Sequence, residues 1–175
     1  MKIRNFVALL AVVGSCVGCD QVTKHAAQLW LRGAPGLSFW GDSVRLLYAE
    51  NRGAFLSLGA GWPDPIRFWV FTLFSLGFVI ITLVWVWNRS LEPWTRPQQL
   101  TVLGGTLLAA GGLGNVVDRL FRGGAVVDFM NLGIGSLRTG IFNVADVQIV
   151  VGIALLALVG RAEASPQPSR ASVNP

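Results

Sequence analysis

The sequence predicts an all-α membrane protein with four transmembrane helices and a small extramembrane β-sheet between the first and second spans. Of the 175 residues, 53% are hydrophobic and only 13% are charged, which is far more apolar than a soluble domain. About 20 mostly apolar residues are needed to cross a bilayer, and four segments approach that length. They are residues 3–22, 66–87, 100–117 and 141–160.

These segments define the organisation of the chain. We expect a single four-span membrane domain over residues 1–160, with a surface loop over residues 26–65. The Ser-, Pro- and Gln-containing stretch over residues 161–175 is predicted to be a disordered tail. Because the number of spans is even, both ends of the domain should lie on the same side of the membrane.

The first apolar segment has two interpretations. Lys2 and Arg4 precede a short apolar run and small residues that end at Cys19, which resembles a cleaved lipoprotein-type signal. The helix can also continue through Val22, which gives about 20 residues and therefore an uncleaved span. We favour the span, because the rest of the chain is itself a membrane protein that needs anchoring helices.

Cys16 and Cys19 form a C-x-x-C pair within this segment. The alternative function that they suggest is a four-span thiol-disulfide oxidoreductase, and a Cys-free variant that keeps its activity would exclude it. We favour a packing role, because cysteine is a small apolar residue and a helix interior lacks the setting that activates a thiol. His25 is the single histidine, which excludes a multi-histidine metal site. We expect no metal and no cofactor.

The loop over residues 26–65 carries tryptophans suited to a membrane interface, at positions 30, 40 and 62. Residues 43–50 have strand character and are followed by a turn at Asn51, Arg52 and Gly53. A small sheet on the membrane surface is therefore expected. By themselves, Asn51 and Gly53 are best explained as turn residues, since both types tolerate positive φ.

The third span is rich in glycine, including Gly111, Gly112 and Gly114. We expect these glycines to leave room for an extended substrate segment beside the helix. The alternative is that they only allow neighbouring helices to pack closely. The second span, residues 66–87, is the clearest of the four because no charge follows Arg67 within it.

The basic residues point to no particular partner or orientation. The net charge is +5 and the sequence pI is about 10.2, but the Lys and Arg residues are scattered, so nucleic-acid binding is not expected. The 14 Lys and Arg residues divide almost evenly between the two sides of the membrane, so the positive-inside rule does not decide the orientation.

Three aspartates lie inside or beside the last two spans, at positions 118, 128 and 146. An ionised carboxylate within a bilayer costs roughly 3 kcal/mol or more, so such residues usually serve a cavity or a reaction. Asn115 and Asp118 share one helix face by their spacing, as do Asn143 and Asp146. The extended-looking run between the two motifs could return Asp128 toward Asp146.

Five motifs in this order resemble the bacterial lipoprotein signal peptidase family, signal peptidase II. They are Asp20-Gln-Val-Thr-Lys24, Asn51-Arg-Gly-Ala-Phe55, Gly111-Gly-Leu-Gly-Asn115-Val-Val-Asp118-Arg119, Val127-Asp128-Phe129 and Phe142-Asn-Val-Ala-Asp146. The likeness extends from the first span to the fourth. The chain departs from the family pattern before Phe55, where the motif is one residue shorter.

The resemblance implies an aspartic endopeptidase of the bacterial inner membrane. Its substrates would be lipid-modified prolipoproteins, cut before the diacylglyceryl-modified cysteine, with membrane lipids as the other partners and no obligate protein partner. It also implies cytoplasmic termini and a site near the periplasmic leaflet. Asp128 and Asp146 would be catalytic, and the supporting or substrate-contacting positions would be Asp20, Lys24, Asn51, Gly53, Gly111, Asn115, Asp118, Arg119, Asn143 and Ala145.

The chemistry of paired acids agrees with this assignment. Two carboxylates held close together share one proton, so one can act as a base toward water while the other protonates the departing group. Asn115 and Asn143 are placed to orient the acids, and Asp118 is the best candidate for a structural ion pair, with Arg119 as one possible partner. Serine and cysteine protease motifs such as G-x-S-x-G are absent.

Overall fold

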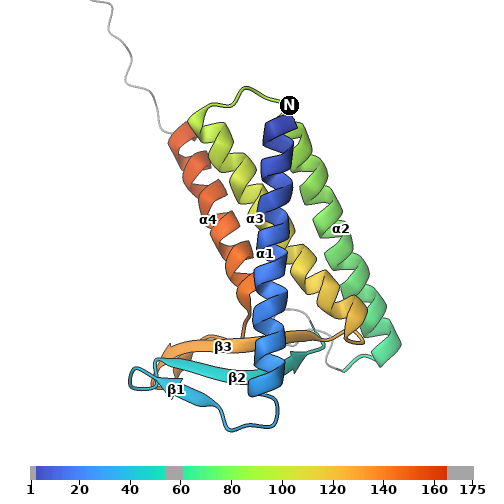
Figure 1. Cartoon of the computed structure of the whole chain (residues 1–175), viewed down its shortest axis with the longest axis vertical. Coiled ribbons are helices and arrows are strands. Elements are labelled where there is room, and N and C mark those ends of the chain that lie inside the picture. Colours follow the sequence, from blue (N-terminus) through green and yellow to red (C-terminus); the bar gives the residue numbers. More distant parts are fainter. Residues whose placement is uncertain (1–2, 54–60, 165–175) are drawn as a thin grey trace, which may run out of the picture.

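The computed structural model describes residues 3–53 and 61–164. Within that part of the chain, four helices are long and apolar enough to cross a membrane. They are α1 (Ile3–Trp30), α2 (Asp64–Ser90), α3 (Arg96–Phe121) and α4 (Val144–Ala164). They form a bundle whose one end is crossed by a small sheet (Figure 1). The prediction of four spans with a small β-sheet is therefore confirmed.

The helices are longer than the apolar segments alone indicated. Helix α1 runs to Trp30, so the start of the expected surface loop is helical. Helix α4 begins at Val144 and continues to Ala164, so the first residues of the expected tail are helical as well. Residues 165–175, which hold the rest of the predicted tail, lie outside the described residues, as does Phe55.

Helix α3 is the central element of the bundle and packs against each of the other three helices. It begins after Thr95, whose hydroxyl accepts a hydrogen bond from the backbone N–H of Gln98 at 3.4 Å. Such an N-cap satisfies a donor that the first turn of a helix leaves free. Most of the buried residues along α3 are small, including glycines and alanines.

The glycines of α3 are contact points between helices, which corrects the expectation that they leave space for substrate. A Cβ atom on Gly111 would lie 2.4 Å from the carbonyl oxygen of Ala145 in α4. On Gly112 it would lie 2.8 Å from Cγ2 of Val79 in α2. Small residues allow this because helices can approach closely only where no side chain intervenes.

The sheet has the order β1-β2-β3-β4 and is antiparallel throughout. Strands β1 (Leu37–Phe39) and β2 (Val44–Asn51) come from the connection between α1 and α2, as predicted. Strands β3 (Val126–Ile134) and β4 (Leu137–Arg138) come from the connection between α3 and α4 and complete the sheet. The pairing of β2 with β3 brings Asn51 opposite Val126.

Candidate active site

Asp128 lies in β3 and Asp146 in the first turn of α4, and Asn143 contacts both carboxylates. Its side-chain Nδ2 donates to Oδ1 of Asp128 at 2.6 Å, and its backbone N–H donates to Oδ2 of Asp146 at 3.1 Å. Its Oδ1 accepts a hydrogen bond from the backbone N–H of Asp146 at 3.0 Å. The extended run therefore brings the two acids to one site, as its pattern indicated.

The other two carboxylate oxygens accept hydrogen bonds from two further asparagines. Asn51 Nδ2 donates to Oδ2 of Asp128 at 3.1 Å, and Asn115 Nδ2 donates to Oδ1 of Asp146 at 3.0 Å. Each of the four carboxylate oxygens thus receives one N–H group. Asn51 also forms the predicted turn, because its Oδ1 accepts the backbone N–H of Gly53 at 3.1 Å.

The two acids differ in burial. Asp128 is only 3% exposed, whereas Asp146 is partly exposed. Burial, and after it the negative charge of Asp146, raises the pKa of Asp128 to about 6, against the opposing effect of the hydrogen bonds from Asn51 and Asn143. Asp128 therefore keeps its proton to a higher pH than an aspartic acid in water does.

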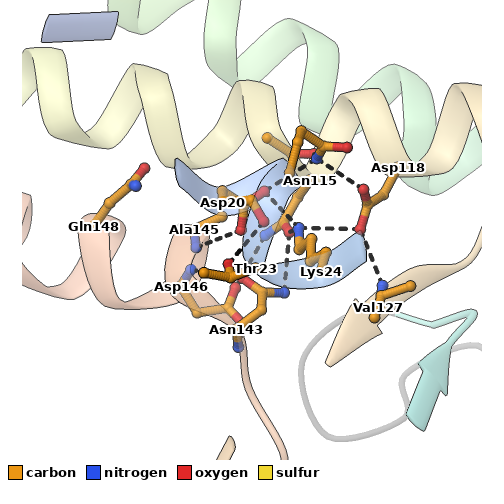
Figure 2. A network of polar contacts seen from close by, with 12 residues as sticks. Asp20, Thr23, Lys24, Asn115, Asp118, Val127, Asn143, Ala145, Asp146 and Gln148 are labelled. Atoms are coloured by element: carbon orange, nitrogen blue, oxygen red, sulfur yellow. Dashed lines mark hydrogen bonds and ion pairs between the residues drawn. The ribbon is translucent and has the colours of Figure 1, made fainter. Parts of the chain in front are cut away.

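Next to the acids lies a buried charged cluster, which we define as Asp20, Lys24 and Asp118. The Lys24 ammonium is 2.8 Å from Asp20 and 3.0 Å from Asp118, and all three side chains are fully buried (Figure 2). Asp20 and Lys24 had two interpretations, a solvated pair or a contact at the mouth of the site. The structure shows a buried pair, because α1 passes alongside α3 at this level.

The cluster is joined to the acids through Asn115. Lys24 Nζ donates to Oδ1 of Asn115 at 2.9 Å, and the Nδ2 of that asparagine faces Asp146. Asn143 Nδ2 also donates to Oδ1 of Asn115 at 3.2 Å. The charged cluster therefore continues through Asn115 and Asn143 to Asp146 (Figure 2), and the hydrogen bond from Asn143 adds Asp128 to the same polar network.

Asp118 forms a structural ion pair as predicted, but Arg119 is not its partner. Its carboxylate pairs with Lys24 and with Arg122, and it accepts the backbone N–H of Val127 at 3.0 Å. Arg122 is the residue that follows the last turn of α3, four positions after Asp118, and it reaches the side of the helix that carries Asp118, whereas the next residue in a helix points elsewhere.

Arg119 lies instead beside the two acids. It is 8% exposed, and its Nη2 donates to the carbonyl of Gly53 at 3.4 Å. Its guanidinium lies within electrostatic reach of Asp128 and Asp146 as well as of Asp118. The buried guanidinium of Arg119 therefore supplies positive charge near Asp128 and Asp146.

The remaining predicted positions support the network through their backbones. The backbone N–H of Ala145 donates to Oδ1 of Asp20 at 2.9 Å, which fixes the start of α4 against α1. Gly111 allows α3 to approach that same segment, and Gly53 is buried and accepts a hydrogen bond from Arg119. All of the sequence-predicted positions thus lie in or next to one network.

Two glutamines that the sequence patterns did not indicate also take part in the contacts between the helices. Gln21 Nε2 donates to Oδ1 of Asp118 at 2.9 Å and to Oδ2 of Asp20 at 3.1 Å. Gln148 Nε2 donates to the carbonyl of Cys16 at 3.0 Å, which joins α4 to α1. Gln21 lies within the Asp20-to-Lys24 motif, in which the charged residues give the stronger sequence signal. Gln148 follows Asp146 in an apolar helix and could have been noticed as an isolated amide.

The described residues hold no group of three or more His, Cys, Asp or Glu side chains that could bind a metal ion. Cys16 and Cys19 are free thiols on α1, the first partly buried and the second exposed.

Similarity to known proteins extends over most of the chain. A family model described as signal peptidase (SPase) II matches residues 12–160. The lipoprotein signal peptidase of Borrelia duttonii is 34% identical over 155 residues, covering 86% of this chain and 87% of the relative. That of Mycobacterium leprae is 34% identical over 161 residues, covering 89% of this chain and 72% of the relative.

A solved structure supports the fold. It is a bacterial membrane enzyme determined by the in meso method at 2.3 Å resolution, and it matches with a TM-score of 0.71 at 22% identity over 93% of both chains. Because the family model covers most of the chain and relatives share about a third of its residues, the protein belongs to the signal peptidase II family.

Proposed function

We propose that this protein is an aspartic endopeptidase of the bacterial inner membrane that removes signal peptides from lipid-modified prolipoproteins. The single observation that carries the proposal is the dyad of Asp128 and Asp146, bridged by Asn143 and held by an N–H group on every carboxylate oxygen. The relatives named lipoprotein signal peptidase support the substrate class.

In this mechanism the dyad holds one proton, which resides on the more buried Asp128. Asp146 accepts a proton from water as the water oxygen attacks the scissile carbonyl carbon. Asp128 then gives its proton to the departing amide nitrogen as the peptide bond breaks. One proton remains on the dyad, now on Asp146, and passes back to Asp128 before the next turnover. No covalent intermediate forms.

Arg119 and the asparagines assist without taking part in proton transfer. Arg119 is buried beside the dyad, so its charge stabilises the negative charge that develops on the carbonyl oxygen during attack. Asn51, Asn115 and Asn143 hold the two carboxyl groups in position. Preorganised donors of this kind need no rearrangement at the moment of reaction.

The site also suits a substrate that remains anchored in lipid. The dyad lies where α4 begins and where the sheet crosses the end of the bundle, so the scissile bond would reach it laterally from the bilayer (Figure 1). We place this end at the periplasmic leaflet and the termini in the cytoplasm. The bond cut would then be the one before the diacylglyceryl-modified cysteine, whose acyl chains stay in the membrane.

The direct test is to incubate the purified protein in detergent with a lipid-modified prolipoprotein and to measure release of the signal peptide. We expect release from the modified precursor and none from the same precursor without its lipid. A Cys16→Ser/Cys19→Ser variant should cleave like the wild type, which would exclude the thiol oxidoreductase alternative. A folded protein that leaves the modified precursor intact would refute the proposal.

The pH dependence of cleavage should report the proton on Asp128. We expect kcat/KM to fall on the alkaline side, at or above pH 6, because ionised Asp128 can no longer act as the acid. Asn51→Ala should move this limb to higher pH, since the lost hydrogen bond had favoured the ionised form. The measurement is kcat/KM against pH for both proteins, and a limb that stays in place or moves to lower pH would contradict the assignment.

A further inference from the structure

The end of the sheet that lies away from the dyad has one apolar and one polar face. Residues opposite each other on neighbouring strands point to the same side, and successive residues alternate. The register aligns Phe39 with Val44 and Leu132, and Ile134 with Leu137, on one face. The opposite face carries Ser38, Arg45, Asn131 and Arg138.

The apolar face is largely uncovered at this end. Ile134 is 80% exposed and Leu137 is 83% exposed, and Trp40 in the turn between β1 and β2 is 82% exposed. These side chains, together with Leu37, Phe39 and Leu132, form what we call the apolar sheet end. An exposed apolar patch of this kind marks a contact with a membrane or another molecule.

The backbone of the tip is held in an uncommon conformation. Trp40, Gly41 and Asp42 have φ angles of 50°, 59° and 72°, and positive values cost free energy for residues other than glycine. The Asp42 carboxylate offsets this by accepting hydrogen bonds from Ser38 Oγ at 2.7 Å and Arg45 Nε at 2.7 Å. These bonds, that of Arg45 foremost, hold the pKa of Asp42 well below its usual range, so the bonds persist near neutral pH.

The polar face also ties the two hairpins together. Arg138 in β4 donates through Nη1 to the backbone carbonyl of Asp42 at 2.7 Å and through Nε to Oδ1 of Asn131 at 2.6 Å. The tip of β1 and β2 is therefore fixed to the tip of β3 and β4. The sheet end displays its apolar side chains from a rigid base.

The direction of the apolar face follows from β3. Asp128 and the alternate residues Met130, Leu132 and Ile134 share one face of this strand. Asp128 points toward the helix bundle, where Asn143 binds it, and Met130 packs at the edge of the cluster that Ala27 and Leu31 of α1 form with Phe129. The same face continues outward to Ile134, past the helices that cover its inner part.

Helix α1 indicates the surroundings at that level. In Figure 1 it crosses the sheet before it ends. Its last turns still expose apolar side chains, with Val22 at 69%, Leu29 at 64% and Trp30 at 76% exposure. A spanning helix that presents apolar residues and a terminal tryptophan at this height marks the interfacial layer of the bilayer.

We propose that the apolar sheet end lies in the lipid leaflet beside the bundle, with its apolar face against the acyl chains and glycerol groups of the surrounding phospholipids. The face of the sheet that carries Asp128 would then contact the helix bundle at its inner part and lipid at its outer part. The polar face with Arg45 and Arg138 remains on the aqueous side. Amphipathic surfaces with exposed tryptophans partition to the interfacial layer of the bilayer.

The test places a fluorophore at single cysteines in a Cys16→Ala/Cys19→Ala background of the full chain. NBD is attached to Ile134→Cys or Leu137→Cys, and the protein is reconstituted in vesicles of phosphatidylethanolamine and phosphatidylglycerol. We expect a blue-shifted emission, strong quenching by lipids with a nitroxide high on the acyl chain, and little quenching by aqueous iodide. Thermal unfolding in detergent verifies that each labelled protein is folded.

Matched positions set the scale of quenching. Ile81→Cys, at an exposed position of α2, should report lipid, and Ala34→Cys, in the connection before β1, should report water. Ser38→Cys, on the opposite face of the same sheet end, should be quenched more by iodide than Leu137→Cys. Labels at 134 and 137 that behave like the label at 34 would overturn the proposal. Protection from both quenchers would also overturn it, in favour of a second protein copy.

A second readout rests on the proposed function. Ile134→Ser/Leu137→Ser should leave cleavage in detergent unchanged and lower cleavage in vesicles. The reason is that the substitutions weaken the contact between the sheet and the lipid leaflet, and only vesicles contain a leaflet. If the wild type cleaves nothing in either setting, the proposed function fails while the fluorescence result still decides the lipid contact. Equal cleavage by the variant and the wild type in vesicles would show that the contact does not position the site.

Discussion

Asp128→Asn and Asp146→Asn are each expected to lower signal-peptide release by about 10³-fold or more, because a positioned general acid or base contributes roughly 10²–10⁴-fold and neither can be replaced by the other. The fold should survive both changes, since asparagine has nearly the shape of aspartate. The measurement is release from a lipid-modified prolipoprotein, combined with thermal unfolding in detergent. Near wild-type turnover by either variant would refute the dyad.

Two comparison variants separate the dyad from its neighbours. Glu92→Gln, in the exposed connection between α2 and α3, should change neither release nor unfolding. Asp118→Asn should lower stability more than chemistry, because it leaves the Lys24 ammonium without one of its two buried carboxylate partners. A stable, correctly inserted but wholly inactive Asp118→Asn protein would show that the wrong pair of acids has been assigned.

Gly111→Leu is expected to destabilise the fold rather than to block a substrate groove. Its Cβ alone would come within 2.4 Å of the Ala145 carbonyl oxygen and 2.8 Å of Ile149 Cγ1. Overpacking a well-packed site typically costs about 1–3 kcal/mol, and a leucine against a backbone atom should cost about 3 kcal/mol or more. For a chain of this size that corresponds to roughly 10 °C in the unfolding midpoint.

The control for this prediction is Gly77→Leu in α2, where an added Cβ meets no atom within 4 Å. That variant should unfold near the wild-type temperature and cleave normally. The measurement is the thermal unfolding midpoint in detergent beside the cleavage rate. A Gly111→Leu protein with a wild-type midpoint but no cleavage would instead support a substrate groove beside α3.

The sequence by itself determined the four spans and the identity of the polar residues that matter. A run of apolar residues crosses a bilayer whatever its neighbours are, because the backbone must satisfy its own hydrogen bonds in lipid. Charged residues beside such runs are costly, so Asp118, Asp128 and Asp146 stood out without any structure. The extended run around Asp128 could also be predicted from the sequence, because its β-branched and aromatic residues favour a strand.

Only the tertiary structure decided which of these groups meet. The ion-pair partner of Asp118 depends on where α1 passes α3. This packing, and not the local spacing along α3, makes Lys24 the partner instead of Arg119. Asn51 was ambiguous because a turn residue and a dyad ligand have the same local pattern, and only the pairing of β2 with β3 brings it to Asp128. The role of Gly111 was undecided for the same reason, since a missing side chain leaves a gap or a contact according to what another helix places there. These choices rest on contacts between segments far apart in the chain, which local sequence patterns do not encode.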